Sequence, residues 1–297
     1  MAEAFKTLFS PGHTACAGCG QAIAARLVVD TAGANTIIAN NTGCLEVFSA
    51  KYPETAWGVP WIHSLFENAA AVASGIEAAL KYLGLKDKIN IIAQAGDGGT
   101  ADIGLQALSG MWERGHDILY VCYDNEAYMN TGVQRSGLTP FEANTSTSPI
   151  GKILATGNLR PKKPMPEIAF AHGIPYVATA SVGYPQDIQR KVKKALAIKG
   201  PKYIQIHVSC PLGWRHAPNL TLDVSKLAVE TGLYPLIEYE NGKLTQVRKL
   251  TKVKPVEEYL KSQGRFKHIL NSPDAIKLIQ AIADSNIEKY GLIEKKA

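Results

Sequence analysis

A predominantly apolar segment that ends in a glycine-rich turn constrains this chain more than any other feature. Residues 89–95 (INIIAQA) run directly into Gly-Asp-Gly-Gly. Apolar segments of this length that end at a turn are typical of strands buried on both faces of a parallel sheet. We expect a helix over Thr100–Arg114 and a second buried strand over 118–123. This strand–turn–helix–strand order predicts an α/β fold.

The glycine-rich turn combines features that bind anions with one carboxylate. Gly96, Gly98 and Gly99 lack Cβ atoms, so backbone amides there can approach a phosphate closely. The positive end of the expected helix points to the same place. Asp97 adds a negative charge among these groups. A divalent cation that bridges Asp97 to a diphosphate explains why a carboxylate stands among anion-binding groups. Carboxylate and phosphate oxygens are the ligands that Mg²⁺ prefers.

Further oxygen ligands follow the second expected strand, in the segment Asp124-Asn125-Glu126-Ala127. Ligands of open α/β sheets gather at the carboxyl ends of the strands. A glycine-rich turn alone also suits other nucleotide-binding folds. With the second strand and Asn125 added, the stretch resembles the thiamine-diphosphate signature, in which Gly-Asp-Gly is followed one strand later by Asn. That resemblance implies that Asp97, the side chain of Asn125 and the carbonyl of Ala127 hold Mg²⁺.

The composition describes an ordinary globular protein. The chain has 297 residues, of which 20% are charged and 46% hydrophobic, and it could form one large α/β domain or two small ones. Its first residues contain no basic segment followed by an apolar core, so we expect no signal peptide. No apolar run approaches the length that crosses a bilayer. We therefore expect a cytoplasmic protein without membrane association.

The formal net charge of +6 comes largely from the carboxyl-terminal third of the chain. We find no nucleic-acid-binding module and no basic stripe with interleaved aromatic residues, so nucleic acid is not an expected partner. A solvated helical face explains the charge. A positive surface would also suit an acidic protein partner through electrostatic steering.

The spacing of the five cysteines indicates a metal centre. Cys16 and Cys19 form a Cys-x-x-Cys turn that opens a helix over 22–29, while Cys44 and Cys210 follow the expected strands 35–39 and 203–208. Four thiolates suit either structural Zn²⁺ or a 4Fe-4S cluster. Zinc sites more often pair two Cys-x-x-Cys turns, and the single one here favours iron–sulfur. A thioredoxin-like redox pair is the other interpretation of Cys-x-x-Cys. Cys122 lies inside an apolar strand and is expected to be a small buried hydrophobe.

Six motifs in order resemble the thiamine-diphosphate- and cluster-binding subunits of the 2-oxoacid:ferredoxin oxidoreductases, and most closely those of the pyruvate branch. The motifs are CAGCG from Cys16, NTGC from Asn41, SLFENAA from Ser64, GDGG from Gly96, NEAYMNTGVQRS from Asn125 and CPLGWR from Cys210. The resemblance implies a thiamine-diphosphate-binding fold, an open and mostly parallel sheet with helices on both faces. We expect this α/β domain over residues 1–235, and a carboxyl-terminal extension over 236–297 that packs on the domain or on a partner subunit.

The resemblance also suggests further site residues. It places Glu67 and Asn68, at the start of an expected helix over 67–82, near the cofactor. The alternative is that both satisfy backbone amides at the helix terminus. It places Asn130, as the catalytic residue, and Thr131 beside the reactive part of the cofactor. Asn130 could instead cap its own turn. A long loop over 134–164 is expected to be functional or to cover something, and Trp214 to shield a cluster or to pack a loop.

The implied activity is oxidative decarboxylation of pyruvate with coenzyme A to acetyl-CoA and CO₂, with electrons passed through the 4Fe-4S cluster to ferredoxin, or the reverse. In the family, other subunits hold the pyrimidine half of the cofactor and further clusters, which implies alpha-type, gamma-type and ferredoxin-like delta-type partners. Three alternatives stay open. The substrate could be a branched-chain 2-oxoacid, phenylglyoxylate or oxalate. The chain could be a non-redox thiamine-diphosphate decarboxylase or synthase with a structural metal site, or a zinc-stabilised assembly subunit.

Overall fold

The computed structural model describes residues 7–51, 53–151 and 156–294, and these form one α/β sheet structure. The sheet in this part of the chain has eight strands in the order β2-β1-β3-β4-β6-β5-β7-β8. The pairs from β2 to β5 are parallel, and β7 and β8 join as an antiparallel edge. The strands are β1 (Thr36–Asn40), β2 (Trp61–His63), β3 (Asn90–Gly96), β4 (Leu119–Asp124), β5 (Tyr176–Ser181), β6 (Lys202–His207), β7 (Ile237–Glu240) and β8 (Lys243–Val247).

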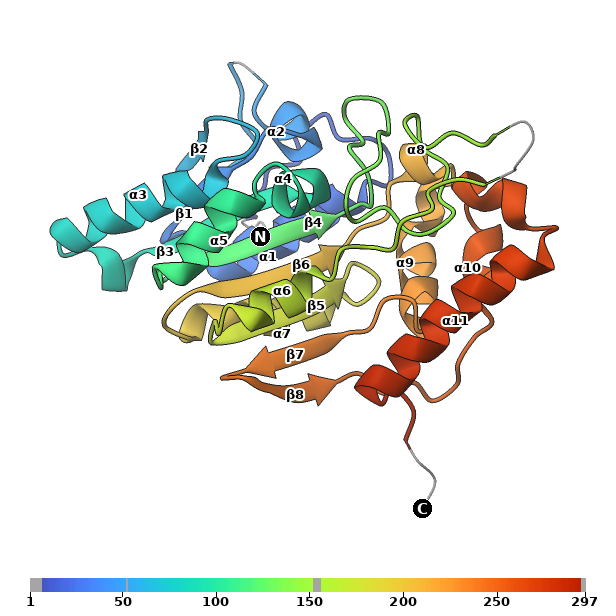
Figure 1. Ribbon diagram of the computed structural model, residues 1–297. Coiled ribbons are helices and arrows are strands. Elements are labelled where there is room, and N and C mark those ends of the chain that lie inside the picture. Colours follow the sequence, from blue (N-terminus) through green and yellow to red (C-terminus); the bar gives the residue numbers. More distant parts are fainter. Residues whose placement is uncertain (1–6, 52, 152–155, 295–297) are drawn as a thin grey trace, which may run out of the picture.

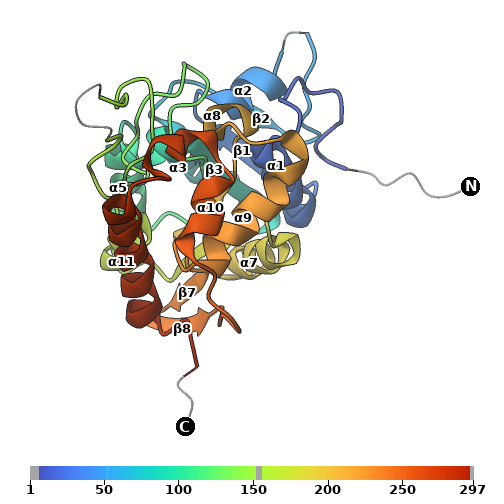
Figure 2. The same cartoon turned by 90° about the vertical axis from the view of Figure 1, so that its right-hand side faces the viewer.

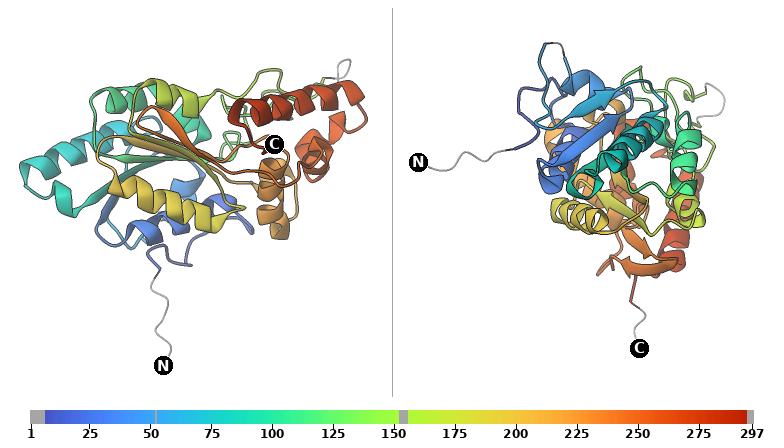
Figure 3. Two further views of the ribbon diagram at one scale, coloured as in Figure 1. Left: turned by 90° about the horizontal axis from the view of Figure 1, so that it is seen from below. Right: turned by 90° about the vertical axis from the view of Figure 1, so that its left-hand side faces the viewer.

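Helices cover both faces of the sheet (Figure 1; Figure 3, left). One face carries α1 (Gly20–Ala32) and α7 (Pro185–Ala197). The other carries α3 (Ala69–Tyr82), α5 (Leu105–Glu113) and α6 (Met165–Ala171). The predicted fold class, an open and mostly parallel sheet with helices on both faces, is confirmed.

The central strand β4 shows why the sequence of these strands is continuously apolar. All its residues are buried. Val121 and Tyr123 point into the core below α1 and α7, whereas Tyr120 and Cys122 point into the core below α3 and α5. Because both faces are covered, successive side chains are apolar rather than alternating with polar ones. Cys122 is fully buried in this core, as predicted.

The carboxyl-terminal helices lie beyond the carboxyl ends of the central strands (Figures 1 and 2), whereas β7 and β8 extend the sheet beside β5. A third hydrophobic core joins these carboxyl-terminal helices to the two α-helices that follow β6. The expected boundary at residue 235 falls just before β7, which continues the sheet. β7 and β8 form a hairpin that turns at Asn241 and Gly242, both with positive φ. The helices here are α8 (Pro211–Trp214), α9 (Thr221–Glu230), α10 (Val256–Lys261) and α11 (Pro273–Tyr290), with 3-10 helices η2 (Pro218–Leu220) and η3 (Gly264–Ile269).

One predicted helix is wrong in its form. Instead of a single helix over Thr100–Arg114, the chain forms α4 (Asp97–Ala101) and then α5. The helix breaks at Asp102, whose backbone angles (φ −115°, ψ −92°) are not helical, and Gly104 then lies so close to Gly99 that a Cβ atom there would be only 2.0 Å from the Gly99 carbonyl oxygen. Three short elements were not predicted. They are α2 (Cys44–Ser49) and β2, which lie near the site, and η1 (Lys86–Lys88), which follows α3.

Among the helices in the part of the chain that the structure describes, none has the length and apolar character that a bilayer crossing requires.

Candidate cofactor site

A cleft opens where β1, β3 and β4 end. It brings together eight of the residues expected to hold the cofactor or its metal, and Cys44 lies in the same cleft. The expected residues that line it are Gly96, Asp97, Gly98, Gly99, Asn125, Ala127, Asn130 and Thr131. The site therefore forms at the strand ends where open α/β sheets bind ligands.

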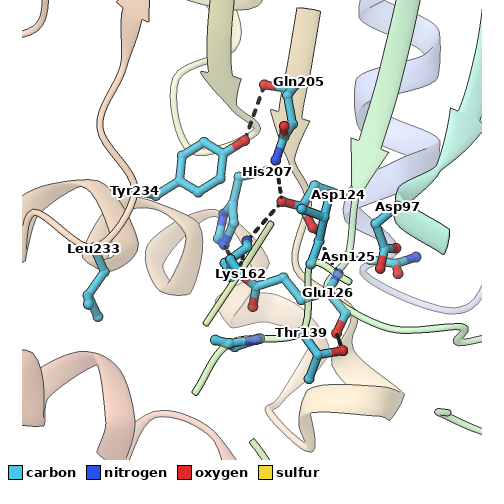
Figure 4. Close-up of polar contacts among 12 residues, drawn as sticks. Asp97, Asp124, Asn125, Glu126, Thr139, Lys162, Gln205, His207, Leu233 and Tyr234 are labelled. Carbon is cyan, nitrogen blue, oxygen red and sulfur yellow. Dashed lines mark hydrogen bonds and ion pairs between the residues drawn. The ribbon is translucent and has the colours of Figure 1, made fainter. Parts of the chain in front are cut away.

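The side chain of Asn125 is the point where the expected metal ligands meet (Figure 4). One terminal atom of its amide lies 2.9 Å from Oδ1 of Asp97 and 2.8 Å from the carbonyl oxygen of Ala127. If that atom is nitrogen, it donates to both neighbours. If it is oxygen, three oxygens face one another, an arrangement that needs a cation between them. The donor set of carboxylate, amide oxygen and carbonyl oxygen fits Mg²⁺.

Asp97 is buried at the floor of the cleft, with 1% of its surface exposed. Burial and the neighbouring Asp124 raise the pKa of the Asp97 carboxyl well above its usual range. The hydroxyl of Ser136 donates to its Oδ2, whereas Oδ1 faces Asn125. A carboxylate held in this position gains from a bound cation, because the cation stabilises the negative charge that burial has removed from water.

The three glycines of the turn have different roles. A Cβ atom on Gly96 would meet nothing within 4 Å, so this glycine borders open space in the cleft. A Cβ atom on Gly98 would lie 2.3 Å from the ring of Tyr128, and one on Gly99 2.9 Å from the side chain of Asn41. Gly98 and Gly99 therefore make room for neighbouring side chains. This role differs from the predicted one, in which they let backbone amides approach a phosphate.

Asn41 is a structural residue of the site that the sequence reasoning missed. It is buried, its amide nitrogen donates to the carbonyl of Gly99 at 3.1 Å, and its Oδ1 accepts from the backbone of Ala69 at 2.7 Å. It thereby ties the end of β1 to the glycine turn and to the start of α3. Its place directly after a predicted strand was the sequence signal that could have identified it as a site residue.

The two acidic neighbours of Asn125 face away from the cleft. Asp124 and Glu126 were expected to supply oxygen ligands together with Asn125 and Ala127. Instead, Lys162 binds both, with its Nζ 2.9 Å from Asp124 and 2.7 Å from Glu126 (Figure 4). Asp124 is the last residue of β4, and the chain turns directly after it, with a φ of 68° at Glu126, so that both carboxylates face Lys162 while Asn125 faces the cleft.

Glu67 and Asn68 do not line the cleft, and Phe66 stands there instead. Oδ1 of Asn68 accepts from the backbone of Leu65 at 3.0 Å, and its amide donates to Ser64 at 3.2 Å. Asn68 precedes α3, but its side chain makes no capping hydrogen bond to that helix, so the alternative expectation of a helix cap is not met by Asn68.

Asn130 and Thr131 are exposed at the edge of the cleft. The hydroxyl of Thr131 donates to the Gln134 side chain at 2.5 Å. Part of the long loop that follows, residues 152–155, lies outside the described residues.

The segments that carry Cys16, Cys19 and Cys210 are packed directly against one another. The amide of Gly20 donates to the carbonyl of Ser209 at 3.2 Å, and a Cβ atom on Gly20 would lie 2.7 Å from that carbonyl oxygen. Only glycine allows this approach, so Gly20, directly after Cys19, lets the Cys-x-x-Cys turn pack against the Cys210 segment.

The cysteine thiols influence one another. Burial raises the pKa of Cys19 to about 11, with Cys210 and Cys16 adding to the effect. Burial also raises the pKa of Cys44 to about 12. Smaller contributions in the same direction come from Cys210, Cys19, Cys16 and Asp97. Within residues 7–51, 53–151 and 156–294, no three His, Cys, Asp or Glu side chains are grouped closely enough to bind a single metal ion.

Comparisons with known proteins agree with this site. The family model of the thiamine pyrophosphate enzyme C-terminal TPP-binding domain matches residues 41–206. Pyruvate synthase subunit PorB of Methanosarcina barkeri is 59% identical over 290 residues, covering 97% of this chain and 98% of that protein. Ketoisovalerate oxidoreductase subunit VorB of Pyrococcus abyssi is 50% identical over 271 residues, covering 89% and 87%.

A solved structure shows the same fold. The 2-oxoglutarate:ferredoxin oxidoreductase from Magnetococcus marinus superposes with a TM-score of 0.55 at 22% identity, over 72% of this chain and 76% of that one.

The parallel sheet and the cleft at its strand ends, together with the matching family model, define a thiamine-diphosphate-binding domain. The chain belongs to the family of the beta subunits of pyruvate:ferredoxin oxidoreductase, also called pyruvate synthase, and is an oxidoreductase subunit of a multi-subunit complex.

Proposed function

We propose that the cleft binds the diphosphate of thiamine diphosphate through Mg²⁺, held by Asp97, the side-chain oxygen of Asn125 and the carbonyl of Ala127. The observation that carries this proposal is the meeting of three such groups within 2.9 Å at the Asn125 amide. The buried Asp97 supplies the charge, and Gly96 leaves the cleft open beside it. When bound, thiamine diphosphate supplies a carbanion that adds to a 2-oxoacid and accepts electrons after CO₂ leaves.

We also propose that Cys16, Cys19, Cys44 and Cys210 bind a 4Fe-4S cluster. Burial, with a smaller contribution from the neighbouring cysteines, raises the pKa of Cys19 and of Cys44, and an iron cluster would supply the positive charge that stabilises their thiolates. The tight packing of Gly20 on Ser209 brings the chain segments of three of these cysteines together. Cys44 lies in the cofactor cleft itself, so an electron would have a short path between the two groups.

The proposed reaction is oxidation of pyruvate with coenzyme A to acetyl-CoA and CO₂, with transfer of electrons to ferredoxin, or the reverse. Pyruvate is favoured because two PorB relatives, at 59% and 58% identity, are more similar to this chain than the VorB relative of Pyrococcus abyssi at 50%. Asn130, at the edge of the cleft, is the proposed catalytic contact to the reacting part of the cofactor, with Thr131 beside it. The proposed partners are alpha-type, gamma-type and ferredoxin-like delta-type subunits, and ferredoxin as electron acceptor.

The test is an anaerobic visible spectrum with iron, sulfide and thiamine analysis of the complex purified through this chain. We expect a broad iron–sulfur absorption that bleaches when pyruvate and coenzyme A are added. A colourless protein with bound zinc would overturn the cluster and the ferredoxin-linked reaction. Bleaching by ketoisovalerate but not by pyruvate would reassign the substrate, because VorB relatives are also close in sequence.

A further inference from the structure

Arg265 comes from the carboxyl-terminal extension, 139 residues after Glu126 in the chain, yet its guanidinium is buried against the cofactor site. It lies in η3 with 3% of its surface exposed. Its NH2 donates to Oε2 of Glu126 at 2.5 Å, and its guanidinium carbon lies 3.8 Å from the centre of the Trp214 ring. One side chain of the extension therefore contacts both the segment of Asn125 and Ala127, which lines the cleft, and Trp214 behind it.

The first contact holds a strained turn. Glu126 has a φ of 68°, in the left-handed region that a residue with a Cβ atom seldom adopts. Its carboxylate is bound on one oxygen by Lys162 and on the other by Arg265. Its carbonyl accepts a hydrogen bond from Thr139 at 2.7 Å. Because Glu126 stands between Asn125 and Ala127, its conformation decides where these two groups point.

The second contact reaches the same turn from another direction. The indole nitrogen of Trp214 donates to the backbone carbonyl of Asn125 at 2.8 Å. Trp214 is fully buried, and it follows Cys210 by one turn of helix in α8. Stacking of Arg265 on Trp214 is a favourable contact between a cation and an aromatic ring. The position of the Asn125 backbone is thus supported through Trp214 as well.

We propose that Arg265 is a positioning residue for the cofactor site, which sets the orientation of Asn125 and Ala127 through its contacts with Glu126 and Trp214. This inference rests on the proposed binding of thiamine diphosphate and Mg²⁺ in the cleft. Among the described residues of the carboxyl-terminal extension, none lines the cleft itself. Through Arg265 the extension would still contribute to cofactor binding. Contacts of this kind behind metal ligands fix their orientation and tune affinity.

The experiment uses the purified complex after removal of its cofactor, and measures binding of thiamine diphosphate by calorimetry at several Mg²⁺ concentrations. We expect Arg265→Met to weaken binding by about 10- to 100-fold, as loss of outer contacts does in other metal sites. Excess Mg²⁺ should recover part of the binding, because the ligands themselves are intact. Trp214→Phe keeps the aromatic packing but removes the donor to Asn125, and should weaken binding in the same direction.

The matched control is Lys202→Met. Lys202 is also a buried cation, paired with Asp117 at 2.5 Å, but it lies at the opposite end of β6. We expect this variant to lower the melting temperature and to leave cofactor affinity unchanged.

Three results would decide against the inference. Wild-type affinity in Arg265→Met would overturn it, and so would an equal loss of affinity in Lys202→Met, which would indicate general destabilisation. If Arg265→Met does not fold, wild-type affinity in Trp214→Phe overturns it. A wild-type complex that binds no thiamine diphosphate would instead overturn the proposed function.

Discussion

Cys44 and Asp97 face the same cleft, although they lie in different motifs and at the ends of different strands. Cys44 begins α2 after β1, and Asp97 begins α4 after β3. β1 and β3 are parallel neighbours, with Asn40 in register with Gln94. The candidate cluster site and the candidate metal site are therefore neighbours because their strands are.

This arrangement predicts which cysteines the iron content depends on. Cys44→Ser and Cys210→Ser should each lose most of the iron and sulfide of the complex. Cys122→Ala should retain both, because Cys122 is buried inside β4, and should cost only about 1 kcal/mol of stability. Iron and sulfide analysis under anaerobic conditions makes the comparison. Full iron content in Cys44→Ser would exclude it as a ligand.

Gly98 and Gly96 should respond differently to the same substitution. Gly98→Ala puts a methyl group into the ring of Tyr128 and should destabilise the protein by about 1–3 kcal/mol, as overpacking does. Gly96→Ala meets no protein atom within 4 Å, so it should fold normally and weaken cofactor binding by narrowing the cleft. Thermal unfolding and calorimetric titration separate the two effects. A Gly96→Ala protein with full cofactor affinity would show that the cofactor leaves this space free.

Asp97→Asn should separate stability from function. The Asp97 carboxylate is buried beside Asp124, so replacing it by a neutral amide should stabilise the cofactor-free protein, on the order of 1 kcal/mol. The same change removes the charge that holds Mg²⁺ and should abolish measurable thiamine diphosphate binding. Melting curves with and without cofactor test both parts. Retained binding in Asp97→Asn would contradict the proposed metal site.

The antiparallel edge of the sheet should contribute an acid-sensitive part of the stability. Burial alone would raise the pKa of Glu238, but Arg190, Lys194 and Tyr176 bind its carboxylate and lower the pKa below its usual value. Since the folded state has the lower pKa, this stabilisation is present above the unfolded value of about 4.3 and is lost as pH falls below it.

Glu238→Gln should therefore be less stable than wild type at pH 7, by about 1–2 kcal/mol, and the difference should shrink at more acidic pH. Denaturant unfolding at pH 7 and near pH 3 measures it. Glu240→Gln is the matched control, because Glu240 is partly exposed and binds one of the same lysines. A stability difference that is constant with pH would contradict the assigned pKa shift.

Much of the fold followed from local patterns. The buried strands around 89–95 and 118–123 lie close to where they were predicted, because a strand covered on both faces needs apolar residues throughout. The helix expected over Thr100–Arg114 was wrong, since it breaks at Asp102 and Gly104 then packs against the backbone of Gly99. Contacts of that kind join residues that no periodic pattern relates.

The sequence by itself determined the order of the strands and helices, the glycine-rich turn and which side chains stand at strand ends, because these depend on local residue preferences and on alternation. Only the tertiary structure decided that Asn125 and Ala127 face Asp97 while Glu126 faces Arg265. The reason is physical. A left-handed turn at Glu126 is unfavourable alone and persists through partners that come from distant parts of the chain.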